Sequence, residues 1–208
     1  MFKINNKLYL PLLLACAFSC FMVSLAGQQV PSVEENIDFL VTFGESATNN
    51  WGDDDHVQTH FIAIPKTQSK AIYIRVFDPD CGGEHDQING AFNTKTKFSI
   101  YGGIGCYSNK DARDINPIGD FKSGVLLASK IFSVDSKYDN NWYTFGPINP
   151  KEGEFDAELN AYVFKIIVEG LTGDDGNMYR YFLTSEETTN KPVEGGNFFA
   201  YEITFRLK

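Results

Sequence analysis

The feature that most constrains the fold of this chain is a series of short runs rich in Val, Ile, Tyr, Phe and Thr, separated by clusters of Gly, Asn, Asp and Pro. Such runs are typical of β-strands joined by turns. We expect about nine strands, at residues 37–43, 59–64, 71–77, 97–101, 125–132, 142–145, 162–169, 179–184 and 198–207.

Several of these runs alternate between apolar and polar residues. Ile72, Ile74 and Val76 would share one face of a strand, and residues 201–207 are apolar at odd positions and polar at even ones. This period of two indicates sheets with one buried and one wet face, and no stretch after residue 26 has the 3.6-residue period of a helix. The sequence therefore predicts an all-β, two-sheet antiparallel sandwich with jelly-roll or Greek-key connections.

The N-terminus has the pattern of a secretory signal peptide. Lys3 and Lys7 precede an uncharged apolar stretch, and residues 24–26 form a small-x-small cleavage site. We expect residues 1–26 to be removed and the protein to be secreted, periplasmic or part of the cell envelope. Two alternatives stay open: a lipoprotein anchored at Cys16, which follows Leu-Leu-Ala, and an uncleaved membrane anchor.

The rest of the chain is expected to form one domain. Residues 27–36 are polar and indicate a linker, and residues 37–208 contain no repeat and no internal linker. The 208 residues carry 27 acidic and 18 basic side chains, a net charge of −9. This balance excludes a nucleic-acid-binding protein, which needs a cationic surface.

Two of the four cysteines lie in the predicted signal peptide, so Cys81 and Cys106 would remain in the mature chain. Because an exported protein enters an oxidising compartment, we expect a Cys81–Cys106 disulfide bond. The alternative is a pair of buried free thiols.

The strongest chemical signal follows the third predicted strand. Asp78, Asp80, Glu84 and Asp86 place four carboxylates within nine residues, around the glycines at 82 and 83. Calcium takes six to eight oxygen ligands, and a flexible loop gathers carboxylates easily. The spacing is not that of an EF-hand. The segment therefore predicts a calcium site, which the expected disulfide bond would pre-organise.

The pattern Asp78-x-Asp80, five residues and Asp86, followed by Ile88 and Gly90, resembles the third calcium-binding loop of C2 domains. C2 domains are β-sandwiches that bind calcium through loops at one end, so the resemblance implies that the three aspartates are ligands. The basic membrane-facing surface of C2 domains is missing here. We therefore expect no direct membrane binding unless Cys16 is lipidated.

Other residues could extend this site or bind a second ligand. Asp53 and Asp55 lie in an acidic run between the first two strands and are candidate calcium ligands. The acidic turn at residues 173–177 could also supply ligands, but a tight hairpin alone explains it and is the favoured interpretation. Trp51 and Tyr107 flank loops and are candidate ligand-binding aromatics, because aromatic rings stack on sugars. Trp142 and Tyr143 are expected to pack at the edge of the core instead.

The exported context and the aromatic pattern Tyr179-x-Tyr181-x-Leu183 resemble bacterial pre-peptidase C-terminal domains and carbohydrate-binding modules. No nucleophile elbow, phosphate loop or paired-histidine motif is present, so we expect no enzyme. The favoured function is an exported calcium-binding module for a glycan or an envelope protein. The alternatives are a structural envelope protein and a hydrolase with a carboxylate site.

Overall fold

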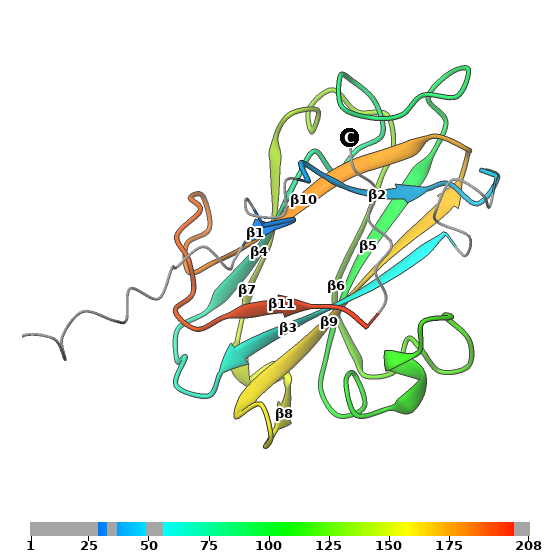
Figure 1. Ribbon diagram of the computed structural model, residues 1–208. Helices are drawn as coiled ribbons and strands as arrows, with labels where there is room; N and C mark the ends of the chain where they lie inside the picture. The colour runs from blue at the N-terminus through cyan, green and yellow to red at the C-terminus, as the bar shows by residue number, and fades with distance from the viewer. Residues whose placement is uncertain (1–28, 33–36, 49–55, 202–208) are drawn as a thin grey trace, which may run out of the picture.

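The computed structural model describes residues 29–32, 37–48 and 56–201. These residues form eleven β-strands and two short 3-10 helices, and every strand pairing is antiparallel. The strands make two sheets, of five and six strands (Figure 1). The predicted all-β, two-sheet sandwich is therefore confirmed.

The five-stranded sheet has the order β1-β10-β4-β7, and β2 pairs with another part of β10. Its strands are β1 (Gln29–Val30), β2 (Leu40–Phe43), β4 (Ile72–Phe77), β7 (Trp142–Ile148) and β10 (Gly176–Thr184).

The six-stranded sheet has the order β11-β3-β9-β5-β6, and β8 pairs with β9. Its strands are β3 (Val57–Pro65), β5 (Lys95–Gly102), β6 (Val125–Phe132), β8 (Glu154–Asp156), β9 (Ala161–Thr172) and β11 (Asn197–Phe199). The 3-10 helices η3 (Lys110–Arg113) and η4 (Pro150–Glu152) lie in connections at the end of this sheet where β5 ends.

The core lies between the two sheets. As the alternation predicts, β4 points Ile72, Ile74 and Val76 into it, and all three are fully buried. The facing sheet contributes apolar side chains from β3, β5 and β9 to the same cluster. Aromatic rings join the two layers, as where Phe98 of β5 meets Tyr179 of β10 edge to face at 5.1 Å between ring centroids.

The outer face of the six-stranded sheet differs from the expected wet face. The segment 103–124 covers it, so Lys165 and Ile167 of β9 are fully buried on that side. The Lys165 ammonium donates to the backbone oxygens of Phe121 at 2.5 Å and Ser123 at 2.9 Å. Burial lowers the pKa of this lysine to about 8. The lysine thus fastens the covering segment to the sheet.

Several predicted boundaries differ from the observed ones. Within the stretch expected as a linker, β1 pairs with Tyr181 and Phe182 of β10. The last expected strand, at 198–207, is observed only as β11 at Asn197–Phe199. Residues 200 and 201 are not in a strand, and positions 202–207 lie outside the described residues. The predicted signal peptide at 1–26, with Cys16, also lies outside them. Among the residues that the structure describes, no helix is long and apolar enough to cross a membrane.

The expected disulfide bond is wrong, because Cys81 and Cys106 are both buried free thiols. Cys81 lies beside Thr94, immediately before β5. Cys106 follows the other end of β5 and donates from its sulfur to the backbone oxygen of Val163 at 3.3 Å. The eight residues of β5 span about 25 Å at ~3.3 Å per residue, whereas disulfide-bonded Cα atoms are within about 7 Å.

Candidate metal centre

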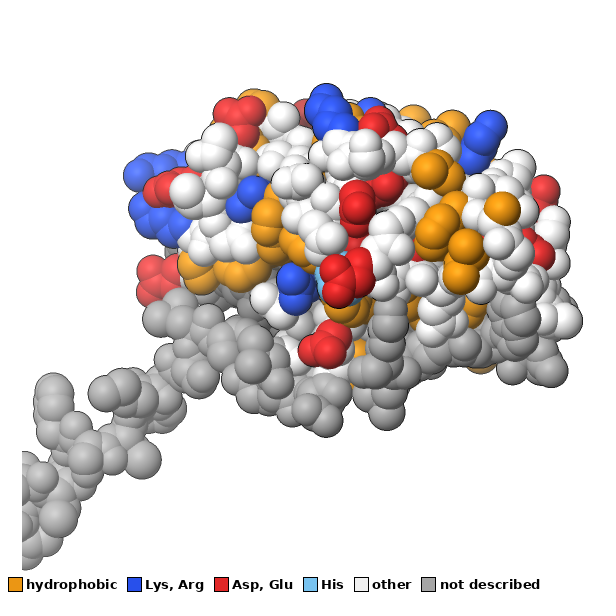
Figure 2. All heavy atoms as spheres, turned by 90° about the horizontal axis from the view of Figure 1, so that it is seen from above, with side chains coloured by type: hydrophobic (Ala, Val, Ile, Leu, Met, Phe, Trp, Pro, Cys, Tyr) orange, Lys and Arg blue, Asp and Glu red, His pale blue; other side chains and the backbone are white. Residues whose placement is uncertain are grey.

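The acidic segment predicted as a calcium site lies at one end of the sandwich. The connection 78–94 leaves β4 there, the connection 133–141 enters β7, and the turn 173–175 joins β9 to β10. These three connections lie at the upper end in Figure 1. Figure 2, which looks onto this end, shows acidic side chains gathered between hydrophobic ones near the middle of the view.

Asp78 is the first carboxylate of the segment and is fully buried. Its backbone has φ +55°, a left-handed conformation that a non-glycine residue adopts at some cost. One carboxylate oxygen, Oδ1, accepts from the backbone N–H of Asn140 at 2.8 Å. The other, Oδ2, is buried and accepts no hydrogen bond. Burial raises the pKa of this carboxyl group.

Asp80 is only 1% exposed and has the same arrangement. Its Oδ2 accepts from the backbone N–H of Asp135 at 3.2 Å, and its Oδ1 is buried without a partner. Burial raises the pKa of Asp80 to about 6, and the nearby carboxylates of Asp78 and Asp139 raise it further. Two neighbouring carboxylates thus each keep one oxygen free of hydrogen bonds.

A third buried oxygen without a partner belongs to Asn177 of β10. Its side-chain amide donates to the backbone oxygen of Pro79 at 2.8 Å, which places Asn177 beside the residue between the two aspartates. Carboxylate and amide oxygens are the ligands that calcium prefers. The residues present therefore fit a hard cation in the type of their donor atoms.

Asp86, the third aspartate of the predicted loop, uses both its oxygens within the protein. One accepts from the backbone N–H of Gly82 and the other from that of Met178, each at 2.6 Å. Burial raises the pKa of Asp86 to about 8, although both hydrogen bonds oppose this rise. These contacts close the turn 82–86 and tie it to β10, so Asp86 positions the loop.

Of the remaining predicted ligands, the structure describes Glu84 and does not bring it into this group. Glu84 is exposed, on the surface of the same turn. Asp53, Asp55 and Trp51 lie outside the described residues. In the ranges 29–32, 37–48 and 56–201, no three His, Cys, Asp or Glu side chains are grouped so that they could hold a metal ion. Within these ranges, a site at this end would combine the two aspartates with amide or backbone oxygens.

Asp175 supports the site and was not predicted as a functional residue. It is fully buried in the β9–β10 turn and accepts from the backbone N–H groups of Asn89 at 2.8 Å, Asn93 at 2.7 Å and Thr94 at 3.3 Å. The backbone N–H of Asp175 donates in return to the Thr94 hydroxyl at 2.9 Å. This network fixes the second half of the connection 78–94 without a disulfide bond.

Tyr107, predicted as a ligand-binding aromatic, lies beyond the opposite end of β5. Its hydroxyl hydrogen-bonds that of Tyr201 at 2.9 Å, and its ring packs edge to face on Phe61 and Phe199. The Arg113 guanidinium lies 5.3 Å from the ring centroid. These contacts join the segment 103–124 to the strand β11. The role of Tyr107 in ligand binding stays a prediction.

Comparison with protein-family models finds no match to this chain. Comparison with curated proteins and with solved structures likewise finds no match. Any account of the function therefore depends on the residues and contacts described above.

Proposed function

We propose that this protein is an exported, non-catalytic calcium-binding β-sandwich module that binds a glycan or a protein ligand at the cell envelope or outside the cell. The observation that carries the calcium site is the set of buried oxygens without partners on Asp78, Asp80 and Asn177. The resemblance to a C2 calcium loop implies Asp78, Asp80 and Asp86 as ligands. We retain the first two as ligands and assign Asp86 a positioning role, because both its oxygens accept backbone hydrogen bonds.

The energetic argument concerns carboxylates that are buried together. An ionised carboxylate oxygen that receives no hydrogen bond in the protein interior is costly, and a second carboxylate nearby raises the cost. A divalent cation removes both penalties, because it replaces missing hydrogen bonds and cancels the charge. Calcium suits the site better than a soft metal, since the available ligands are all oxygens and neither cysteine carries a free thiolate.

The backbone conformation around Asp78 supports a preformed cation site. Positive φ values occur at Asp78 (+55°) and Asn140 (+57°), in the two connections that face each other. The backbone N–H of Asp78 donates to the Asn141 oxygen at 3.0 Å and that of Asn140 donates to Asp78, so the two connections hold each other in place. Uncommon backbone conformations of this kind cluster at functional sites.

The test is a thermal melt of the mature domain in EDTA and in millimolar calcium. Binding at 100 times the dissociation constant adds about 2.7 kcal/mol, which raises Tm by about 5–10 °C for a domain of this size. We expect this shift to vanish in Asp78→Asn and to persist in Glu84→Gln, a matched acidic control on the same turn. A Tm that calcium leaves unchanged, or an equal shift in Asp78→Asn, would overturn the proposal.

A further inference from the structure

The strand β6 is the longest edge strand that the structure describes. At the other edges, β1, β2 and β11 have only two, four and three residues. Edge strands that short offer few backbone groups to a second chain, and this protects a sheet from pairing with its neighbours. Two longer edge strands remain, β7 with seven residues and β6 with eight.

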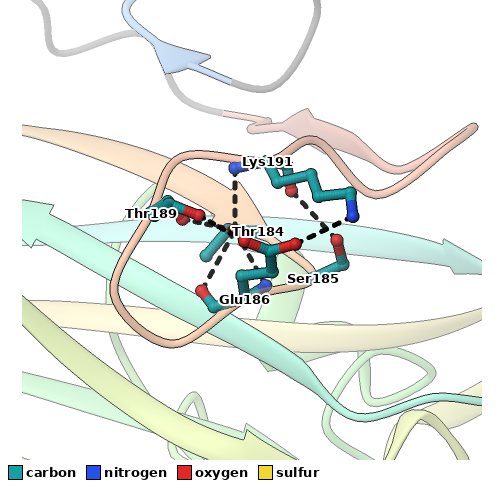
Figure 3. A network of polar contacts seen from close by, with 5 residues as sticks. All are labelled: Thr184, Ser185, Glu186, Thr189 and Lys191. Atoms are coloured by element: carbon teal, nitrogen blue, oxygen red, sulfur yellow. Dashed lines mark hydrogen bonds and ion pairs between the residues drawn. The ribbon is translucent and has the colours of Figure 1, made fainter.

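The β7 edge is interrupted and braced. Pro147 lies within this strand and has no backbone N–H to donate to a neighbouring strand. The loop 185–191 is fastened to β7 by the Glu187 backbone oxygen, which accepts from the Thr144 hydroxyl at 3.0 Å. Figure 3 shows this loop folded around the Thr184 hydroxyl, which accepts two backbone hydrogen bonds at 3.0 Å each. These features make β7 a poor template for another strand.

The β6 edge has neither a proline nor a fastened loop. Among the described residues β6 pairs with β5 alone, so its other side is unpaired. It contains no acidic residue, and Val125, Leu126 and Ile131 are each more than half exposed, at 58%, 52% and 53%. Its one bulge is near Leu127, and residues 128–132 form a regular ladder with β5. A long, apolar edge of this kind is a template for pairing with another strand.

The single charge of β6 is not available at this edge. The Lys130 ammonium lies over the rings of Phe132, Tyr138 and Tyr143, at 5.1, 5.2 and 5.2 Å from their centroids. Cation–π contacts with three rings hold this ammonium within its own protomer. An acidic strand would therefore find no free cation on β6. The strand that fits this edge is apolar and nearly uncharged, and β6 is itself such a strand.

We propose that β6 is a homodimer interface, in which β6 of a second copy of this chain pairs antiparallel with it and joins the two six-stranded sheets into one. A two-fold axis through Ser129 would place Lys130 opposite the partner's Ala128, so no two like charges face each other. The same register brings Ile131 beside the partner's Leu126. This inference goes beyond the proposed function and does not depend on the metal site.

The exposed apolar side chains of β6 agree with this pairing. Leu126 and Ile131 are opposite Tyr101 and Lys97 of β5, which are four residues apart, so both lie on the same face of the sheet. Pairing about the axis would cover them on that face. The chain has a net charge of −9, so two copies repel each other over most of their surface, and association needs a strand without acidic residues. Because the interface is one strand wide, we expect a weak dimer.

The test is sedimentation-velocity ultracentrifugation of the mature protein in EDTA, from micromolar to submillimolar concentration. We expect a monomer–dimer equilibrium that Ile131→Lys weakens about tenfold or more, because a charge then meets the apolar side chains of the partner strand. Leu159→Lys is the matched control, since this leucine is also exposed but lies in the β8–β9 turn. Ser129→Cys should form a disulfide-linked dimer under a mild oxidant, because the two cysteines would face each other at the axis.

A wild type that stays monomeric at submillimolar concentration would overturn the inference. A dimer that Ile131→Lys leaves intact, or that Leu159→Lys weakens equally, would also overturn it, provided that circular dichroism shows both variants folded. Oligomers larger than a dimer would do so too, since pairing about a two-fold axis closes after two copies. Because EDTA is present throughout, failure here leaves the calcium site untouched, and failure to bind calcium leaves this inference untouched.

Discussion

Replacing Asp80 by Asn separates the cost of burying this carboxylate from the benefit of binding a cation. The substitution keeps the shape of the side chain and an oxygen that accepts from the Asp135 N–H, but it removes the charge. In EDTA at pH 7.5 we expect Asp80→Asn to be more stable than the wild type. In calcium we expect the wild type to gain stability and the variant to gain none.

The magnitude follows from the pKa. The pKa of Asp80 is about 6 in the folded state against 3.8 in the unfolded chain, so the folded state holds its proton more tightly. The stability contributed by this group is fully present below pH 4 and is lost as the pH rises through 6. Two pKa units correspond to about 3 kcal/mol, or about 6–12 °C in Tm for a domain of this size.

The assay is urea unfolding followed by tryptophan fluorescence, with both proteins in EDTA and in calcium at pH 7.5. At this pH His60 is neutral in the folded and unfolded states, so its titration does not enter the comparison. The wild type should gain about 2.7 kcal/mol in calcium at 100 times the dissociation constant. An Asp80→Asn variant that is less stable in EDTA, or that keeps the calcium gain, would refute the reasoning.

Three further predictions concern the sandwich itself. His60 is buried, and desolvation lowers its pKa from 6.5 to about 4, so the wild type should lose about 3 kcal/mol as the pH falls across this range. In urea titrations at pH 7 and 4.5, His60→Gln should reduce the loss of unfolding free energy between the two pH values by the part that is due to His60. A loss as large as that of the wild type would contradict this prediction. Cys81 and Cys106 should react with Ellman's reagent only after unfolding, and one mole of disulfide per chain by mass spectrometry would contradict the free thiols. Lys165→Met leaves two carbonyl groups without their donor, so it should cost about 2 kcal/mol and speed hydrogen exchange in residues 103–124. Unchanged exchange there would show that the lysine does not fasten this segment.

The strand pattern was predictable because each strand has one face in the shared core. The alternation of Ile72, Ile74 and Val76 reports directly on that face. The burial of Lys165 was not predictable, because it depends on the segment 103–124 crossing the outer face of the sheet. Nothing in the local sequence of β9 indicates that a distant loop covers it.

In the candidate metal centre, the sequence predicts the two aspartates that are close together along the chain, and not the residue that comes from a distant strand. The spacing of Asp78 and Asp80 at a strand end indicates two oxygens on one side of the chain, and both have an unpartnered oxygen. Asn177 was not singled out, since hairpin geometry was the favoured explanation of the Asp-Gly-Asn turn. The disulfide bond was wrong because pairing two cysteines by elimination ignores the length of the strand between them.

Direct calcium binding tests the central claim most closely. Equilibrium dialysis or calorimetry of the mature domain with calcium chloride should give one ion bound per chain. Asp78→Asn and Asp80→Asn should each abolish binding, and Glu84→Gln should leave it intact. A domain that is folded by circular dichroism and binds no calcium, or that binds it equally well in both aspartate variants, would contradict the account.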